Sequence, residues 1–416
     1  MMFIKQSVSI FGKTLIRFAS SQVISNFLRI ISGFLVVRML DPEQFGLFTG
    51  VGIYLGYFAL GHVGVINGLG REFPFHLGKG NEEYGKQLSN STFGVTAIVA
   101  VLTSVFFLVL AVYNLVNGNS LQGIVFLTYV FIGGLNLFNT AFLPALYRTN
   151  LDFGKLSKIN MVIGVWNLLS VGFVWLFGFW GLLIRGAFLA LLQAWMLFRK
   201  KPYPLKLQLI KDDIVHLVKI GFPIFMVGQV NPLWGNIINN IIFAFGGAKY
   251  FGLYALANIV QTSMLVIPQS FSQVIYPRMS IMYGEGKTPR EIILLNLKPL
   301  FFQFFVILAV ALVGVVILPL IIPFLLPKYT AGIEAAQWIM FVPVVLSFGA
   351  MNNIFNVTKQ QKYYFIALIT GAIIGTLYIV YRLSSSEFNL LVFPQGMILG
   401  KLFQQVVAIF FALRLK

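Results

Sequence analysis

The chain has 416 residues, of which 58% are hydrophobic and only 10% are charged. Globular domains carry about 25% charged residues, so this composition excludes a soluble protein and indicates a polytopic helical membrane protein. The net charge of +18 would suggest a nucleic-acid partner in a soluble chain, but here the basic residues lie between apolar stretches, where they fix membrane orientation. Nucleic acid is therefore not expected as a partner. The chain contains no cysteine, which excludes disulfides, thiolate metal sites and cysteine nucleophiles.

Long apolar stretches predict an all-α fold with twelve membrane spans, each of about 20 residues or slightly more. Residues 1–17 lack the apolar core and cleavage site of a signal peptide, and we expect them to form a short interfacial helix that leads into the first span. The spans are predicted at 18–38, 45–68, 90–115, 121–146, 157–177, 180–198, 219–244, 251–273, 299–325, 334–356, 363–381 and 389–413.

The first span carries an arginine, Arg29, in the middle of the apolar run "SNFLRIISGFLVV". An arginine at the centre of a membrane helix costs about 2.5–3.5 kcal/mol on insertion scales, so it is expected to face protein or water rather than lipid. Arg29 is preceded by Gln22, Ser25 and Asn26 and followed by Ser32, at steps of three and four residues. These side chains therefore share one helical face, which we interpret as part of a lumen.

Later spans also carry polar residues at helical spacing. The predicted substrate-binding residues among them are His62 in the second span, Asn236 and Asn240 in the seventh, Asn258 and Gln261 in the eighth, and Lys401 in the twelfth. The alternative for each amide is an interhelical hydrogen bond, which contributes about 0.6 kcal/mol. His62 also fits a hydrogen-bonded packing residue, and Arg185 lies close enough to the outer boundary to snorkel.

The basic residues alternate sharply between the two sides of the membrane. Of the 30 lysines and arginines, 23 lie in loops on one side, four lie on the other side and three lie inside spans. The positive-inside rule therefore predicts that both termini are cytoplasmic.

An internal duplication relates the two halves of the chain. "FGLF" at Phe45–Phe48 recurs as "FGLY" at Phe251–Tyr254, and the same offset of 206 residues takes "LGKGN" onto "YGEGK". We therefore predict two parallel, pseudo-symmetric six-helix bundles around a central cavity, at 1–198 and 219–416, joined by a cytoplasmic linker at 199–218. A duplication kept only for packing is the alternative.

The acidic residues limit what such a cavity could bind. All twelve lie in loops or at span ends, whereas a carrier of organic cations or a carboxylate proton relay would place one deep in a span. A cavity with fixed cations and no carboxylate favours an anionic substrate.

Two segments resemble a known family. The segment "RMLDPEQFGLFTG" after the first span resembles the outer-loop hallmark of polysaccharide transporters, and "LYRTNLDFGKLSK" after the fourth resembles their basic cytoplasmic stretch. With twelve spans and a length just over 400, the chain is similar to the O-antigen (Wzx-type) flippases of the multidrug/oligosaccharidyl-lipid/polysaccharide exporter superfamily. In that superfamily the first, second, seventh and eighth helices chiefly line the cavity.

This resemblance implies a flippase in the bacterial inner membrane. It would move an undecaprenyl-diphosphate-linked oligosaccharide to the outer leaflet in contact with membrane lipids and without a cofactor, and it leaves a polysaccharide polymerase or chain-length protein open as a partner. The alternatives are a multidrug or cation antiporter of the same fold, whose first-span acid is absent here, and a lipid II flippase, which usually has additional spans. A membrane glycosyltransferase or polymerase would need a sizeable outer loop. There is no Walker loop for direct use of ATP.

Overall fold

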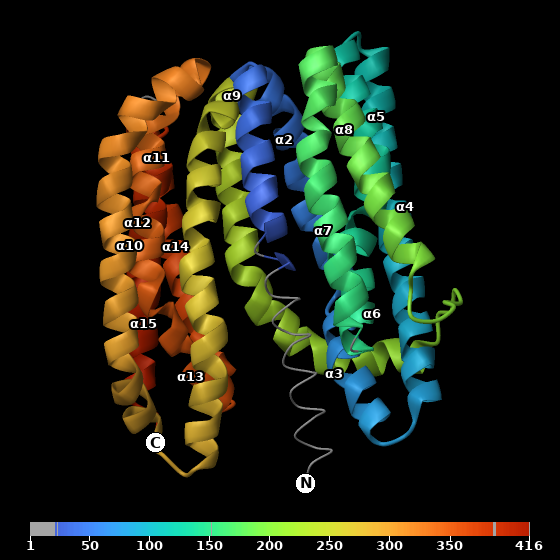
Figure 1. The fold of residues 1–416 in the computed structure, drawn as a ribbon, viewed down its shortest axis with the longest axis vertical. Helices are drawn as coiled ribbons and strands as arrows, with labels where there is room; N and C mark the ends of the chain where they lie inside the picture. The colour runs from blue at the N-terminus through green and yellow to red at the C-terminus, as the bar shows by residue number, and fades with distance from the viewer. Residues whose placement is uncertain (1–20, 23, 151, 386–387, 416) are drawn as a thin grey trace. The chain divides into compact units, whose positions relative to one another are not determined.

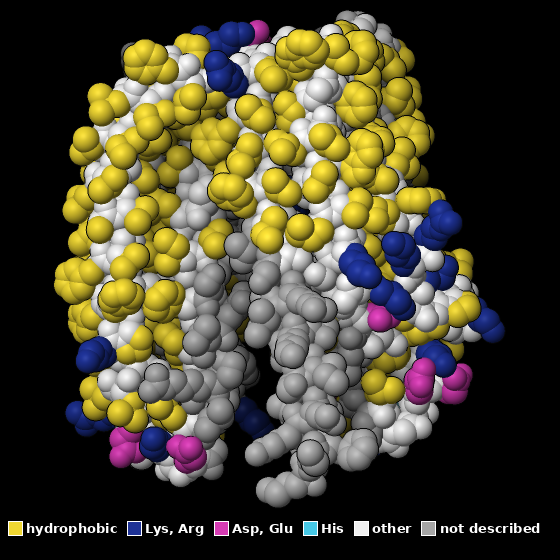
Figure 2. Space-filling view, in the orientation of Figure 1, with side chains coloured by type: hydrophobic (Ala, Val, Ile, Leu, Met, Phe, Trp, Pro, Cys, Tyr) yellow, Lys and Arg dark blue, Asp and Glu magenta, His cyan; other side chains and the backbone are white. Residues whose placement is uncertain are grey.

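The computed structural model describes residues 21–22, 24–150, 152–385 and 388–415 (Figure 1). The interfacial helix expected over residues 1–17 lies outside them. The described residues form helices and short turns without a strand. Hydrophobic side chains cover most of the face seen in Figure 2, and the charged side chains gather toward its ends. The fold is therefore all-α and polytopic, as the composition predicts.

The chain divides into two compact units. Unit 1 contains the described chain up to Leu40 and Leu47–Met226, and unit 2 contains Asp41–Gly46 and the chain from Val227 onward. The division expected at 199–218 stays a prediction.

The first half of the described chain begins with a helix over residues 21–22 and 24–39. The helices that follow it are α2 (Pro42–Phe58), η1 (Ala59–His62), α3 (Val65–Gly78), α4 (Glu82–Val116), α5 (Ser120–Leu137), the π-helical turn η2 (Phe138–Phe142), α6 (Leu143–Thr149), α7 (Phe153–Leu169) and α8 (Val171–Arg199).

The second half begins with the long helix α9. Its helices are α9 (Lys211–Gly284), α10 (Pro289–Leu325), η3 (Pro327–Gly332), α11 (Ile333–Ile339), α12 (Phe341–Val345), η4 (Leu346–Asn352), α13 (Asn353–Val357), α14 (Gln361–Ser385) and α15 (Val392–Leu413).

Nine helical segments of the described chain are long and apolar enough to cross a membrane. The twelve-span fold has three more spans than these nine segments, and the position of each on the sequence explains why it is not counted separately. The helix over residues 21–22 and 24–39 begins beside residues outside the description, and α7, at 17 residues, is shorter than one crossing needs. Spans seven and eight both lie in α9, on either side of a non-helical kink at Gly247.

Two glycines interrupt long helices at the points where consecutive spans meet. Gly178 in α8 has φ 55° and ψ −129°, and Gly247 in α9 has φ 70° and ψ −178°. Side chains with a Cβ are disfavoured in this part of backbone space, so glycine is suited to both kinks. The kinks fall at the boundaries predicted between the fifth and sixth spans and between the seventh and eighth.

Local sequence sets the start of the long helices. Asn81 caps α4 by accepting a hydrogen bond from the Tyr84 amide at 3.3 Å. At the start of α10, Thr288 and Glu291 form a reciprocal capping box around Pro289. Both arrangements satisfy amides that a helix leaves without partners in its first turn.

Each unit includes a short segment from the other half of the chain. Asp41–Gly46 belongs to unit 2, where Lys328 Nζ lies 2.8 Å from Asp41 Oδ1. The start of α2 there packs so closely on α9 that a Cβ on Gly46 would meet the Ala248 carbonyl, and a Cβ on Gly252 would meet that of Pro42. Gly46 and Gly252 are separated by the 206-residue offset of the predicted repeat.

Candidate functional site

A cavity of about 460 Å³ lies inside unit 2. It is lined by the part of α9 after Val227, by α12 and η4, and by α15. The lining residues are Asn231, Pro232, Trp234, Gly235, Gln261, Leu265, Pro268, Gln269, Ser272, Val342, Leu346, Gly349, Ala350, Met397 and Lys401. Its volume falls within the range of about 300–1,000 Å³ that small-molecule sites occupy.

Lys401 of α15 supplies the charge of this cavity. Its side chain is only 5% exposed, and Nζ donates to Asn231 Oδ1 at 2.6 Å and to Gln404 Oε1 at 2.9 Å. The same Nζ lies 4.8 Å from the centre of the Trp234 ring. All three neighbours are neutral, and within the described chain no carboxylate forms an ion pair with Lys401.

The contact of α14 with α15 places Trp234 beside Lys401. Gly371 and Gly375 of α14 face Gly400 and Gly396 of α15 so closely that a Cβ on Gly371 would lie 2.5 Å from the Gly400 carbonyl oxygen. A Cβ on Gly400 would also lie 2.6 Å from the Trp234 ring. The glycines therefore leave the space that the indole fills and allow α14 and α15 to approach closely.

Two of the predicted residues of unit 2, Gln261 and Lys401, line the cavity together. Asn236, Asn240 and Asn258 are half-buried and are not among the lining residues. The sequence interpretation missed Asn231 and Trp234. Together with Gly235, these residues stand at helical steps of three and four, which is the signal that could have identified them.

The predicted residues on the first helix of unit 1 divide into a packing edge and an exposed side. Ser25 is fully buried, and its hydroxyl donates to the Asn160 carbonyl of α7 at 2.8 Å. Ser32 donates to the Asn167 carbonyl in the same way at 2.6 Å. Ser25 therefore has the interhelical bonding role of the alternative interpretation, and a substrate contact for it stays an untested prediction.

Arg29 projects away from this packing edge. Its side chain is exposed in the described structure, and its Nε donates to the Ser25 carbonyl of its own helix at 3.4 Å. No described carboxylate forms an ion pair with it. Asn26 is likewise exposed and Gln22 is half-buried, so these three polar groups are accessible.

Arg185 of α8 finds its partners inside unit 1. Nη2 donates to Ser32 Oγ at 2.7 Å and to the Asn167 carbonyl at 3.3 Å, and Nε donates to Ser170 Oγ at 3.1 Å. The guanidinium therefore links α8 to the first helix and to the end of α7. The sequence interpretation expected it to snorkel to the membrane surface.

His62 is packed within unit 1. It is 5% exposed, its Nδ1 accepts from the Gly64 amide at 3.2 Å, and its ring meets Phe225 edge to face at 4.7 Å. These contacts match the packing alternative that the sequence left open.

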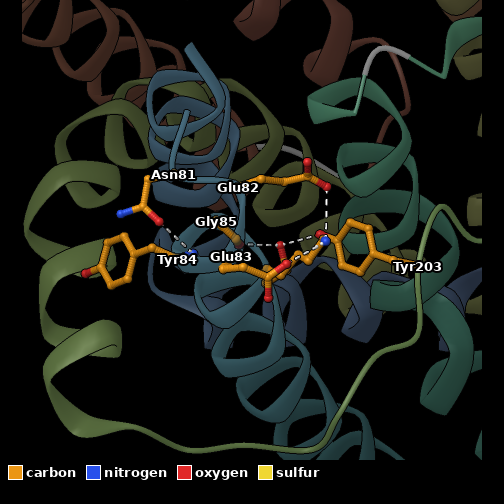
Figure 3. Close-up of polar contacts among 8 residues, drawn as sticks. Asn81, Glu82, Glu83, Tyr84, Gly85 and Tyr203 are labelled. Carbon is orange, nitrogen blue, oxygen red and sulfur yellow. Dashed lines mark hydrogen bonds and ion pairs between the residues drawn. The ribbon is translucent and has the colours of Figure 1, made fainter. Parts of the chain in front are cut away.

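A polar network at the start of α4 fixes the segment after α8 onto unit 1 (Figure 3). Tyr203 donates to Ser89 Oγ at 2.7 Å and stacks on Phe73, and burial raises the pKa of its hydroxyl to about 12. Lys86 bonds Glu83 at 2.9 Å and Glu82 at 3.1 Å. These hydrogen bonds raise the pKa of Lys86.

The two buried carboxylates of the described chain lie in the same region of unit 1. Asp213 accepts hydrogen bonds from Gln87 Nε2 and from Ser91 Oγ, the latter at 3.0 Å. Glu72 lies 3.2 Å from His216 Nε2. The described residues contain no cluster of three or more metal-ligating side chains.

A family model for polysaccharide biosynthesis proteins matches residues 11–283. Among curated protein sequences, none matches the chain significantly.

Similar solved structures cover more of the chain than the family model does. An inward-facing multidrug resistance MATE family transporter of the MOP superfamily aligns over 96% of this chain and 97% of its own, with a TM-score of 0.78 and 14% identity. A MOP superfamily transporter from Pyrococcus furiosus, whose binding pocket is described as reversed in polarity, covers 97% and 95%, with a TM-score of 0.65 and 15% identity. An outward-facing multidrug resistance MATE family transporter aligns over 97% of this chain and 95% of its own, with a TM-score of 0.58 and 16% identity. At these identities the likeness establishes the fold alone.

Proposed function

Because this chain belongs to the polysaccharide biosynthesis protein family, we propose that it is a flippase for a lipid-linked oligosaccharide. It moves an undecaprenyl-diphosphate-linked O-antigen repeat, or another surface-polysaccharide unit, from the cytoplasmic to the outer leaflet of the bacterial inner membrane. Both termini are cytoplasmic, and movement follows alternating access of two bundles around a central cavity. The protein transports its substrate and does not change it chemically.

The observation that carries this proposal is an exposed arginine in a membrane helix that forms no ion pair with a described carboxylate. Arg29 is exposed, and among the described residues its Nε bonds a backbone carbonyl of the same helix. Its planar guanidinium can bind two phosphate oxygens at once, which suits a diphosphate that must cross about 30 Å of hydrocarbon. Asn26 and Gln22 beside it offer hydrogen bonds to the glycan, while the polyprenyl tail stays in lipid.

The described residues fit the alternative functions less well. A cation antiporter binds its substrate through an acid in a membrane helix, whereas the buried acids Glu72 and Asp213 are already bonded to His216, Gln87 and Ser91. A lipid II flippase would share the diphosphate and hence the role of Arg29. The glycan attached to that diphosphate distinguishes it from the leading proposal.

Complementation tests the proposal in cells. The gene is expressed in a strain that makes the cognate lipid-linked glycan but lacks its flippase, and surface polysaccharide is measured together with drug sensitivity. We expect surface polysaccharide to return without a change in drug sensitivity. Restored drug resistance without surface polysaccharide would contradict the proposal and support the antiporter.

A further inference from the structure

The cavity of unit 2 has more hydrogen-bond donors than acceptors around Lys401. An ammonium group has three N–H donors and no acceptor. Two donors of Lys401 are used by Asn231 and Gln404, and the third has no hydrogen-bond acceptor among the described residues. Lys401 lines the cavity directly, so this third donor is available to a ligand there.

The neighbouring amides add to this surplus. Because a lysine can only donate, Gln404 must turn its oxygen toward Lys401, and its buried Nε2 is left without a partner. Gln405 Oε1 accepts from Asn352, and Gln405 Nε2 also lacks a partner. That Nε2 lies 3.4 Å from where a Cβ on Gly349, a lining residue, would stand. Gln404 and Gln405 are not among the lining residues, so the donors that reach a ligand in the cavity are those of Lys401 and of the lining residues themselves.

The rest of the lining fits a hydroxylated ligand. Asn231, Gln261, Gln269 and Ser272 present amide and hydroxyl groups beside apolar residues such as Pro232. Such polar groups can both donate to and accept from sugar hydroxyls. The volume of about 460 Å³ accommodates a small organic group of this kind.

The charge of the cavity selects among anionic groups. Lys401 is a single point charge, and the described lining residues include no second cation. A diphosphate carries more than one negative charge and is matched better by the fork of an arginine, such as Arg29 in unit 1. One ammonium group matches a single carboxylate.

We propose that the cavity of unit 2 is a subsite for an acidic sugar of the transported glycan, with Lys401 Nζ bonded to the sugar carboxylate. This inference rests on the proposed function for the origin of the glycan, and it makes the substrate class an acidic oligosaccharide. The diphosphate and the acidic sugar then occupy different units of the protein.

Binding of soluble probes tests this subsite without transport. The full-length protein in lipid nanodiscs is titrated with a glucuronic-acid-containing oligosaccharide, with its carboxyl-reduced neutral counterpart, and with methyl diphosphate. We expect the acidic oligosaccharide to bind about tenfold more tightly than the neutral one, which corresponds to about 1.4 kcal/mol. Methyl diphosphate is not expected to displace it.

Two variants remove the charge of the subsite in different ways. Lys401→Met deletes the ammonium group at similar length, and Gln404→Glu supplies a carboxylate within the existing 2.9 Å contact to Lys401. Both should reduce the preference for the acidic oligosaccharide to less than about twofold. Gln404→Glu is expected to fold at least as stably as the wild type, which keeps the test decisive if Lys401→Met does not fold. Arg38→Gln, at an exposed basic residue outside both proposed sites, is the matched control and should retain the preference.

The outcomes separate this inference from the proposed function. Equal binding of the two oligosaccharides by the wild type, or a preference that survives both substitutions, overturns the acidic-sugar subsite. Displacement of the acidic oligosaccharide by methyl diphosphate in the wild type and in Arg29→Gln assigns the cavity to phosphate instead, which also overturns it. A clear preference combined with failed complementation supports the subsite and contradicts the flippase function.

Discussion

Arg29 and Arg185 are two arginines of unit 1 in very different surroundings. Arg185 is bonded to hydroxyl and carbonyl groups on the first helix and on α7, whereas within the described chain the hydrogen bond of Arg29 joins its Nε to the carbonyl one turn earlier. A side chain that bridges helices contributes to stability, and one that is accessible is free to bind a ligand. Substitution should therefore separate their roles.

Arg29→Ala is expected to abolish polysaccharide export while the protein remains inserted and abundant. Arg29→Lys should retain partial function because it keeps the charge but loses the two-donor geometry that suits phosphate. Surface polysaccharide and membrane protein level are measured in the complementation strain. Arg38→Ala, which removes an exposed basic residue at the end of the same helix, is the control. Normal export by Arg29→Ala would refute the phosphate role.

Arg185→Met should instead lower the thermal stability of the purified protein. It leaves Ser32 and Ser170 without their guanidinium partner, and hydrogen bonds to charged groups contribute about 1.5–3 kcal/mol each. Melting is measured in detergent for Arg185→Met and Arg29→Met side by side. A fall for Arg29→Met alone would reverse the two assignments.

The sequence predicted part of the candidate site and could not predict the rest. Helical spacing places Ser25 and Arg29 on one face, but it does not say which helix packs there, so the burial of Ser25 against α7 was not foreseeable. Lys401 and Gln261 could be identified as intramembrane polar residues. Their common cavity also depends on Trp234, whose position is determined by glycines on two other helices.

At the scale of the elements, α14 and α15 illustrate packing through small residues. A Cβ on Gly375 would lie 2.7 Å from the Gly396 carbonyl oxygen and 2.5 Å from the Trp234 ring. Helices in lipid gain stability from such close approach, because burial of apolar surface provides little driving force there. The position of the Trp234 side chain beside the cavity depends on the same contact between α14 and α15.

Gly400→Ala should therefore destabilise unit 2 and weaken binding of the acidic oligosaccharide. The added methyl group would meet the Gly371 carbonyl and Trp234, and overpacking typically costs about 1–3 kcal/mol. Gly172→Ala is the matched control, because nothing lies within 4 Å of a Cβ there and alanine favours the helix. Equal melting temperatures for the two variants would show that the contact does not restrain α15.

The apolar runs predicted the existence of the helices better than their ends. The third span was predicted at 90–115, whereas α4 begins at Glu82, because a capped polar turn extends the helix beyond its apolar part. Spans seven and eight were predicted as separate, and the non-helical backbone of Gly247 divides α9 between them, but α9 begins at Lys211 and ends at Gly284, beyond both apolar runs. Hydropathy detects the apolar length of a segment and not where its backbone hydrogen bonding ends.

For the whole molecule, the predicted duplication relates α4 to α10. These long helices have 35 and 37 residues, and they begin at Glu82 and Pro289, about one repeat apart. The offset of 206 residues was readable from short motifs. The exchange of Asp41–Gly46 into unit 2 was not, because it depends on the close approach of Gly46 to α9.

The orientation of the molecule is tested by reporter fusions. The 23-to-4 split of basic residues predicts that fusions at Gly80 and Pro204 report the cytoplasm and that fusions at Ser120 and Phe179 report the outer side. Alkaline phosphatase and green fluorescent protein activities distinguish the two sides. One reversed pair would contradict the twelve-span orientation.

Translocation by the purified protein is the most direct test of the central claim. The full chain is reconstituted into liposomes that contain undecaprenyl-diphosphate-linked acidic oligosaccharide with a fluorescent label on the glycan, and a membrane-impermeant quencher reports transfer between leaflets, with and without proton and sodium gradients. We predict that the wild type transfers the labelled lipid and that Arg29→Gln remains at the level of protein-free liposomes. Wild-type liposomes that transfer no labelled lipid under any gradient, or Arg29→Gln liposomes that transfer it at the wild-type rate, would contradict the account.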